Sequence, residues 1–285
     1  MPPFDAFFAC IDGTTTRRLC LHHAPSGAPR AAVLHVHAFA EEMNKSRRMC
    51  ARTARALAAE GFAVLQIDLF GCGDADGEWA QVTWAAWQAD LAWAAAWLAR
   101  RWGDVPLWLW GQRAGALLAT ACATSLDRDC NLLLWNPVLQ GKAVTQQFLR
   151  LAAAADWARG DGKAASEQAK ADWAAGRSVE IAGYALNADL VRGLDGATLA
   201  PPPVRRADDA PRLVWLEVAG RDAEPMLSPA AQLQRARWEG AGYRTHMQAI
   251  AGPAFWQTVE IEDAPDLIGA TVDALAGRAT TPGRT

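Results

Sequence analysis

The segment that most specifically suggests chemistry is a short turn rich in small residues, Gly111-Gln112-Arg113-Ala114-Gly115. It follows an apolar run typical of a buried strand, 106–110, and leads into a run typical of a helix, 114–125. Small residues in such a turn let the strand and helix approach closely, while the central residue is strained and displays its side chain. The displayed residue is Arg113. A guanidinium stays protonated in proteins, so Arg113 cannot attack a carbonyl group.

A cation at the start of a helix suits a different chemistry, which is the binding of an anion. Free N–H groups and the helix dipole favour negative charge at a helix N-terminus, and a guanidinium adds a bidentate fork. We therefore expect Arg113 either to bind a carboxylate, phosphate or sulfate, or to form an internal ion pair. The two roles are compatible if a ligand displaces the internal partner.

Two histidines lie at the end of the first strongly apolar run, 31–37, which is typical of a strand buried on both faces. His35 falls within this predicted strand, and we expect it to pack in the core. His37 lies nearer the loop, where a neutral imidazole could donate to a bound oxygen. Glu41 and Glu42 follow; one could be an acid/base partner, but a role at a helix N-terminus is favoured.

Cys72 stands in a glycine-flanked loop after the next predicted strand, at the sheet edge where open α/β folds bind substrates. A Cys72–His37 pair of nucleophile and base is therefore a candidate. Asp68, Asp74 and Asp76 lie in the same segment, but their spacing is not that of a calcium loop, and a turn rich in Asp and Gly explains them better. We expect no metal and no other cofactor.

Strands and helices alternate over most of the chain, which predicts parallel βαβ units and a doubly wound sheet. Two short β-like runs at 7–11 and 17–23 predict an entry hairpin. Further strands are predicted at 31–37, 63–68, 106–110, 131–135, 212–218 and 243–250. Helices are predicted at 44–60, 79–102, 114–125, 228–240 and 265–276.

Residues 140–207 break this alternation. They are rich in alanine, predict helices at 144–159 and 164–175, and leave through three consecutive prolines. We interpret them as a helical lid inserted into a core of 1–139 and 208–278. The tail 279–285 is expected to be frayed.

The composition limits the classes of function. The chain has 285 residues, 51% of them hydrophobic, and a net charge of -3, which argues against a broad nucleic-acid-binding face. No apolar run reaches the length of a membrane span, and the first residues lack the features of a signal peptide. Six widely spaced cysteines predict reduced thiols and therefore a cytoplasmic protein.

Four segments together carry a family resemblance: 35–48 (HVHAFAEEMNKSRR), 68–74 (DLFGCGD), 111–115 (GQRAG) and 252–257 (GPAFWQ). In them the chain resembles the α/β-hydrolase superfamily and, more narrowly, the exosortase A system-associated hydrolase 2 family. The resemblance implies an α/β-hydrolase fold with a mostly parallel, doubly wound sheet. It also implies a bacterial cytoplasmic protein associated with exopolysaccharide and PEP-CTERM protein-sorting systems. The superfamily's turn is G-x-S-x-G, so Arg113 stands where a nucleophilic serine is expected.

The resemblance allows the rest of a catalytic triad to be checked. The acid is expected after the strand 212–218, where Asp222 stands. The histidine is expected near 252–258, which contains none; the nearest, His246, lies inside the last predicted strand. We therefore expect the side chain of Arg113 to extend through the position that a triad histidine would occupy and to form an ion pair with Asp222. We expect no ordinary serine hydrolysis.

Three functions are compatible with these residues. The first is a catalytically impaired hydrolase relative that binds a small anionic or acyl ligand, or a protein partner. Its ligand site is expected to contain Arg113, His37, Phe39, Gln112 and Trp256. The second is an active esterase or thioesterase that uses an unusual set drawn from Cys72, His37 and Asp222. The third is a structural accessory of an exopolysaccharide assembly complex that docks through the lid.

Overall fold

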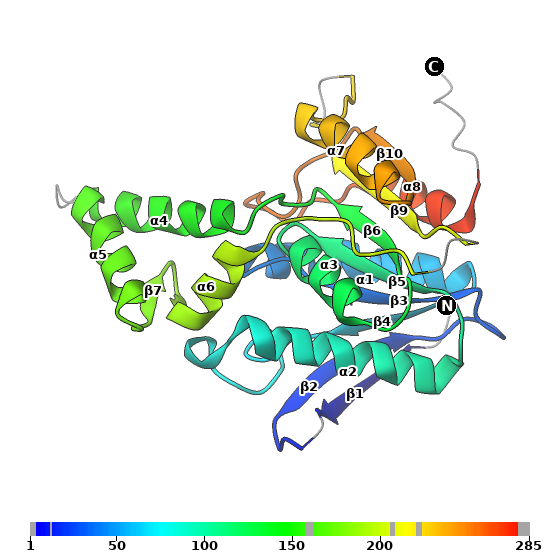
Figure 1. Ribbon diagram of the computed structural model, residues 1–285, viewed down its shortest axis with the longest axis horizontal. Helices are drawn as coiled ribbons and strands as arrows, with labels where there is room; N and C mark the ends of the chain where they lie inside the picture. The colour runs from blue at the N-terminus through cyan, green and yellow to red at the C-terminus, as the bar shows by residue number, and fades with distance from the viewer. Residues whose placement is uncertain (1–3, 12, 158–161, 206–208, 221–223, 279–285) are drawn as a thin grey trace.

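The computed structural model describes residues 4–11, 13–157, 162–205, 209–220 and 224–278. In these residues one large sheet has eight strands in the order β1-β2-β4-β3-β5-β6-β9-β10 (Figure 1). The first two strands and their contact with β4 are antiparallel, and all pairs from β4 to β10 are parallel. The expected α/β class and mostly parallel sheet are confirmed. The strands are β1 (Phe4–Cys10), β2 (Arg17–His23), β3 (Ala31–Val36), β4 (Phe62–Ile67), β5 (Leu107–Gln112), β6 (Asn131–Trp135), β9 (Arg212–Val218) and β10 (Arg244–Ile250).

Helices cover both faces of this sheet. α1 (Glu41–Ala59) and α8 (Pro265–Ala276) pack on one face. α2 (Trp84–Trp102), α3 (Gly115–Ser125) and α7 (Pro229–Gly240) pack on the other. The central strands are apolar throughout because alternate side chains enter two different cores: Val33 joins the core under α1, and Leu34 joins the core under α2 and α3.

The long helix predicted at 79–102 is divided in two. A 3-10 turn, η1 (Trp79–Gln81), comes first, and Val82 is extended after it. α2 then begins at Trp84, where the hydroxyl of Thr83 accepts a hydrogen bond from the backbone N–H of Ala86. A threonine N-cap therefore interrupts a sequence whose tryptophan spacing alone predicts one continuous helix.

The segment after β6 contains the two helices expected there, α4 (Lys142–Trp157) and α5 (Gly162–Ala174). It also contains a hairpin of β7 (Val179–Ile181) and β8 (Tyr184–Leu186) and a short helix α6 (Ala188–Gly196), which the sequence pattern did not predict. Figure 1 shows α4 and α5 standing away from the sheet, with α6 between α5 and the core.

No helix in the part of the chain that the structure describes combines the length and apolar character required to cross a membrane.

Candidate functional site

The turn between β5 and α3 has the strained geometry that its sequence predicts. Arg113 adopts a left-handed backbone with φ 54°, a region that non-glycine residues rarely enter. A Cβ atom on Gly115 would lie 2.3 Å from the carbonyl oxygen of His37, and one on Gly111 would lie 2.5 Å from the Cα atom of Ala116. Both glycines are therefore needed for the helix to approach the strands, and the turn presents Arg113 at the carboxyl edge of the sheet.

The guanidinium of Arg113 is held from three sides. Its Nε atom lies 3.2 Å from Oε1 and 3.3 Å from Oε2 of Glu42, and Nη1 donates to the carbonyl oxygen of Asn136 at 3.0 Å. The guanidinium carbon also lies 5.1 Å from the ring centroid of Trp256, a cation–π distance. An internal ion pair is therefore present, but with Glu42. Asp222, the partner expected from the sequence, lies outside the described residues.

Glu42 reaches Arg113 because α1 begins three residues earlier than predicted, at Glu41 instead of Asn44. Both glutamates lie in the first turn of this helix, as expected. Burial raises the pKa of the Glu42 carboxyl, and the charge of Arg113 opposes that rise. Glu41 accepts a hydrogen bond from the hydroxyl of Tyr184 in β8 at 3.1 Å. The start of α1 thus contacts both the turn and the inserted segment.

His37 is buried beside the turn, and its two ring nitrogens face backbone groups. Nδ1 lies 2.8 Å from the carbonyl oxygen of Ala38, and the N–H of Leu69 points to Nε2 at 3.5 Å. Burial lowers the pKa of His37, so the ring is neutral. These contacts assign the ring proton to Nδ1 and use it for Ala38. They do not favour the predicted role of His37 as a donor to a bound oxygen.

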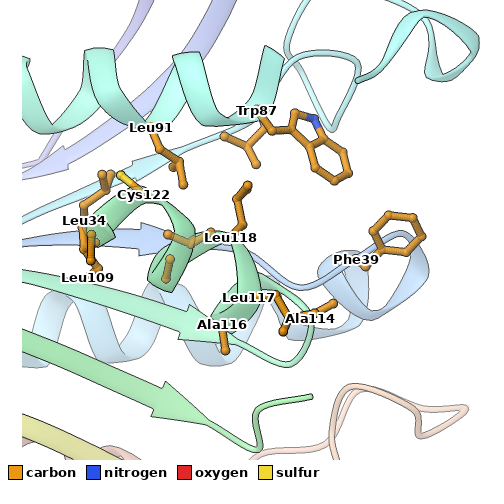
Figure 2. Packing of buried hydrophobic residues seen from close by; sticks show 14 of the residues in the cluster. Leu34, Phe39, Trp87, Leu91, Leu109, Ala114, Ala116, Leu117, Leu118 and Cys122 are labelled. Carbon is orange, nitrogen blue, oxygen red and sulfur yellow. The ribbon is translucent and has the colours of Figure 1, made fainter. Parts of the chain in front are cut away.

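Aromatic side chains fill the space next to the turn. The ring of Phe39 lies 5.5 Å from Trp79, 5.8 Å from Trp87 and 5.5 Å from Phe148, measured between centroids. Figure 2 shows Phe39, Trp87 and Ala114 around the same space at the start of α3. The cavity that His37, Phe39 and Ala114 help to line has a volume of about 10 Å³, which is room for about one water molecule. An organic ligand would therefore have to displace part of this aromatic cluster.

The side chain of Gln112 lies on the α1 side of the sheet. Its Nε2 atom donates to the hydroxyl of Ser46 at 2.7 Å, and its Oε1 atom accepts from the thiol of Cys50 at 3.2 Å. These contacts hold the buried amide under α1. Of the five residues expected at a ligand site, Arg113 contacts Trp256. His37 lines the small cavity beside Phe39 and, together with Gln112, a separate cavity of about 190 Å³.

Cys72 is a buried thiol. Its side chain is 1% exposed, and burial together with Asp68 and Asp90 raises its pKa. A protonated, enclosed thiol is a poor nucleophile, so this environment disfavours the Cys72–His37 alternative. The aspartates of the segment are used in turns: Asp68 accepts from Arg47 and from the N–H of Asp74. Within the described residues no group of three or more His, Cys, Asp and Glu side chains could hold a metal ion.

Asn136 is a site residue that the sequence analysis missed. It has φ 41°, and its side-chain amide bonds to both the N–H and the carbonyl of Val218, with the N–H contact at 2.9 Å. This bracing fixes the carbonyl oxygen that accepts from Arg113. The sequence feature that could have indicated this residue is the pair Asn136-Pro137 at the end of β6, since Asn-Pro favours a turn.

Residues 27–192 match the Hydrolase_4 family, which is described as "Serine aminopeptidase, S33". The chain therefore belongs to this family of the α/β-hydrolase superfamily. No curated protein matches the sequence.

Solved structures support the same fold. Est1E from Butyrivibrio proteoclasticus with bound ferulic acid superimposes with a TM-score of 0.58 at 14% identity, over 97% of this chain and 100% of that one. DcsB in complex with its substrate analogue gives 0.60 at 15% identity, over 98% and 100%. A thermostable carboxyl esterase from Bacillus coagulans gives 0.57 at 14% identity, over 96% and 97%. At these identities the likeness establishes a hydrolase-type α/β fold.

Proposed function

We propose that this protein uses the turn at Arg113 to bind a carboxylate ligand and does not carry out serine-dependent acyl transfer. The observation that carries the proposal is the guanidinium of Arg113, displayed on the turn and already bound to a carboxylate, that of Glu42. A ligand carboxylate offers the same charge and the same pair of acceptor oxygens. The ligand would therefore replace Glu42 on Arg113.

The environment of Glu42 supports such an exchange. Burial raises its pKa, which means that the charged form is disfavoured in spite of the neighbouring arginine. The two side chains are 22% and 20% exposed for Arg113 and Glu42, so one side of the pair reaches solvent. Because burial disfavours its charge, the Glu42 carboxylate leaves the guanidinium at a smaller cost than a carboxylate without that penalty would. Glu42 would then act as an internal competitor that lowers the apparent affinity.

The aromatic cluster suggests the remainder of the ligand. Phe39, Trp79, Phe148 and Tyr184 pack together between the core and the inserted segment. We propose that residues 140–207 act as a lid over a core of 1–139 and 208–278, and that its opening exposes this cluster. The favoured ligand is a carboxylic acid with an apolar or aromatic tail, the tail packing where Phe148 and Tyr184 now lie.

The narrower family assignment also enters the proposal. Three of the four segments that resemble the exosortase A system-associated hydrolase 2 family meet at this site, through Glu42, Arg113 and Trp256. We propose that the protein belongs to that group and works in the cytoplasm beside an exopolysaccharide system. A protein partner docking through the lid is compatible with ligand binding.

Calorimetric titration with hexanoate and benzoate tests the carboxylate site, with hexanamide as the uncharged control. We expect saturable binding of the acids and none of the amide. Arg113→Ala should abolish binding, and Arg192→Ala, which removes an exposed arginine of α6, should leave it unchanged. Glu42→Gln should tighten binding about tenfold because it removes the competing carboxylate. Equal binding by wild type and Arg113→Ala would refute the proposal.

Turnover of p-nitrophenyl butyrate and of an acyl thioester tests the loss of catalysis. We expect no turnover by the wild type and none by Arg113→Ser, because a serine without a base regains little activity. Wild-type turnover that disappears in Cys72→Ala would instead identify the thiol-dependent hydrolase. Turnover by Arg113→Ser would show that a suitable base is present near the turn.

A further inference from the structure

A second hollow lies at the opposite end of the sheet from Arg113. Its volume is about 390 Å³, and it is lined by residues at or before the amino ends of the parallel strands, among them Ala31, Phe62 and Trp108. From Trp108 to Arg113 the chain runs through five residues of β5, about 16 Å of extended backbone. The hollow is therefore separate from the site at the turn.

Arginine is the commonest charged residue in this hollow. Five arginines line it: Arg30, Arg128, Arg205, Arg212 and Arg244. Four aspartates also line it: Asp104, Asp127, Asp129 and Asp209. Two of the arginines have ion-pair partners, since Arg128 lies 3.4 Å from Asp104 and Arg244 lies 3.2 Å from Asp209.

The other three arginines have no carboxylate within ion-pair distance among the described residues. Arg30 donates to the carbonyl of Ala276, Arg205 donates to the carbonyl of Thr124, and Arg212 donates to the carbonyls of Ala274 and Leu275. Arg30 and Arg205 each use one guanidinium nitrogen in this way, so most of their five N–H donors have no acceptor within the part of the chain that the structure describes.

Aromatic faces hold two of these guanidinium groups in place. The guanidinium carbon of Arg30 lies 5.4 Å from the ring centroid of Phe62, and that of Arg212 lies 5.1 Å from the centroid of Trp108. Stacking of this kind fixes an arginine before a ligand arrives and reduces the entropy lost on binding. Phe62 and Trp108 are also buried, so the hollow offers no free aromatic surface from these two residues.

Strand pairing also concentrates positive charge here. Arg212 and Arg244 are directly opposite each other in the parallel pair of β9 and β10. Burial lowers the pKa of Arg212, and the charge of Arg244 lowers it further. Like charges opposite each other across strands destabilise a sheet, and an anion between them would relieve that repulsion.

We infer that this hollow binds a phosphate ester of a polyhydroxylated compound, with the phosphate on Arg30, Arg205 and Arg212. Guanidinium groups bind phosphate through paired hydrogen bonds. Asp104, Asp127 and Asp209 in the lining disfavour a molecule that is only anionic, but carboxylate oxygens are good acceptors for hydroxyl groups. A sugar phosphate or the ribose phosphate of a nucleotide combines both features. Nothing in this inference depends on the site at Arg113.

The test is calorimetric titration of the whole protein with glucose 6-phosphate at low salt. Parallel titrations use glucose, inorganic phosphate and adenosine monophosphate. We expect saturable binding with one site, at least about tenfold tighter than inorganic phosphate, and no binding of glucose. Tighter binding of adenosine monophosphate would support the site and assign it to nucleotides. Equal affinity for glucose 6-phosphate and inorganic phosphate would overturn the polyol part, and absence of saturable binding would overturn the site.

Variants distinguish a binding site from the alternative that these arginines serve only as donors to the carbonyls at the ends of α3 and α8. Arg30→Met with Arg205→Met keeps the apolar stems, and both residues are exposed, so we expect a folded protein that binds at least about tenfold more weakly. Arg192→Met should bind within about twofold of wild type, since Arg192 lies outside the hollow.

Arg244→Gln adds a readout that a purely structural role would not give. It removes the like charge opposite Arg212, so it should weaken binding without lowering the melting temperature of the free protein. A lowered melting temperature with unchanged affinity would show that Arg244 only supports the fold. Unchanged binding by the double variant would refute the assignment.

Discussion

The Oε1 atom of Glu42 lies 3.2 Å from the Nε atom of Arg113, although the two residues are 71 positions apart in the chain. The pair joins the first turn of α1 to the turn before α3. It places a carboxylate and a guanidinium together at the strained turn that follows β5. The local chemistry at the turn is therefore charge pairing, and its energetics can be measured without knowing a ligand.

The two members of this pair should contribute unequally to stability. Arg113→Ala leaves Glu42 without its cation and the carbonyl of Asn136 without its donor, so we expect a loss of about 1–3 kcal/mol. Glu42→Gln should change stability by less than about 1 kcal/mol, because burial already favours a neutral side chain there. Urea unfolding of both variants at pH 7 measures the difference. A larger loss of unfolding free energy for Glu42→Gln than for Arg113→Ala would show that the attraction between the two charges outweighs the cost of burying Glu42.

Acid should destabilise the protein through its histidines. The chain has five, and burial lowers the pKa of every one, to about 4 for His22 and to about 3 for His35. A depressed folded-state pKa gives stability that is present above the unfolded value of 6.5 and is lost as the pH falls towards the folded value. Between pH 7 and pH 5 we expect a loss of about 2 kcal/mol from each of His22 and His35.

Urea unfolding at pH 7, 6 and 5 measures this loss. His22 accepts a hydrogen bond from the indole of Trp102 at 3.1 Å, so His22→Asn keeps an acceptor while removing the titrating group. The variant should lose less stability between pH 7 and pH 5 than the wild type does. Parallel curves for the two proteins would mean that the pKa of His22 is the same in the folded and unfolded states.

Much of the fold was predictable because the spacing of apolar residues in a helix or strand follows the face that it buries. The last helix has the bounds predicted for it, Pro265–Ala276, and the central strands were found as continuous apolar runs. The hairpin of β7 and β8 was missed because strands of three residues are too short to show alternation. Helix α6 was missed although its buried residues Leu190, Val191 and Leu194 repeat at helical spacing, because a run of nine residues is short for a separate helix.

The site was predictable only where its residues are close together in the sequence. Two glycines around Arg113 encode the strained turn, but nothing near Glu42 in the sequence indicates its partner, since tertiary packing brings them together. The partners of Gln112, Ser46 and Cys50, were likewise not indicated by the sequence, although the direction of its side chain was. Neighbouring residues at the end of a strand point to opposite sides, so a displayed Arg113 turns Gln112 under α1.

Close approach at the turn predicts that Gly115→Ala is strongly destabilising. The added methyl group would meet the carbonyl oxygens of Val36 at 2.5 Å and His37 at 2.3 Å, and these backbone atoms cannot move independently of the sheet. We expect a loss of about 2–4 kcal/mol. The matched control is Gly269→Ala in α8, where nothing lies within 4 Å of the new atom. That change should stabilise by about 0.5–1 kcal/mol in urea unfolding, because alanine favours a helix.

Thiol reactivity separates the binding protein from the thiol-dependent hydrolase. Of the six cysteines, Cys10 in the edge strand β1 is exposed, and Cys20, Cys50, Cys72, Cys122 and Cys130 are buried. A native titration with an aromatic disulfide reagent should therefore modify one thiol quickly, and unfolding in urea should reveal all six. Cys10→Ser should remove the fast reaction entirely. A second fast thiol that is lost in Cys72→Ala would mean that Cys72 becomes accessible and ionised in solution, which is what catalysis by that residue requires.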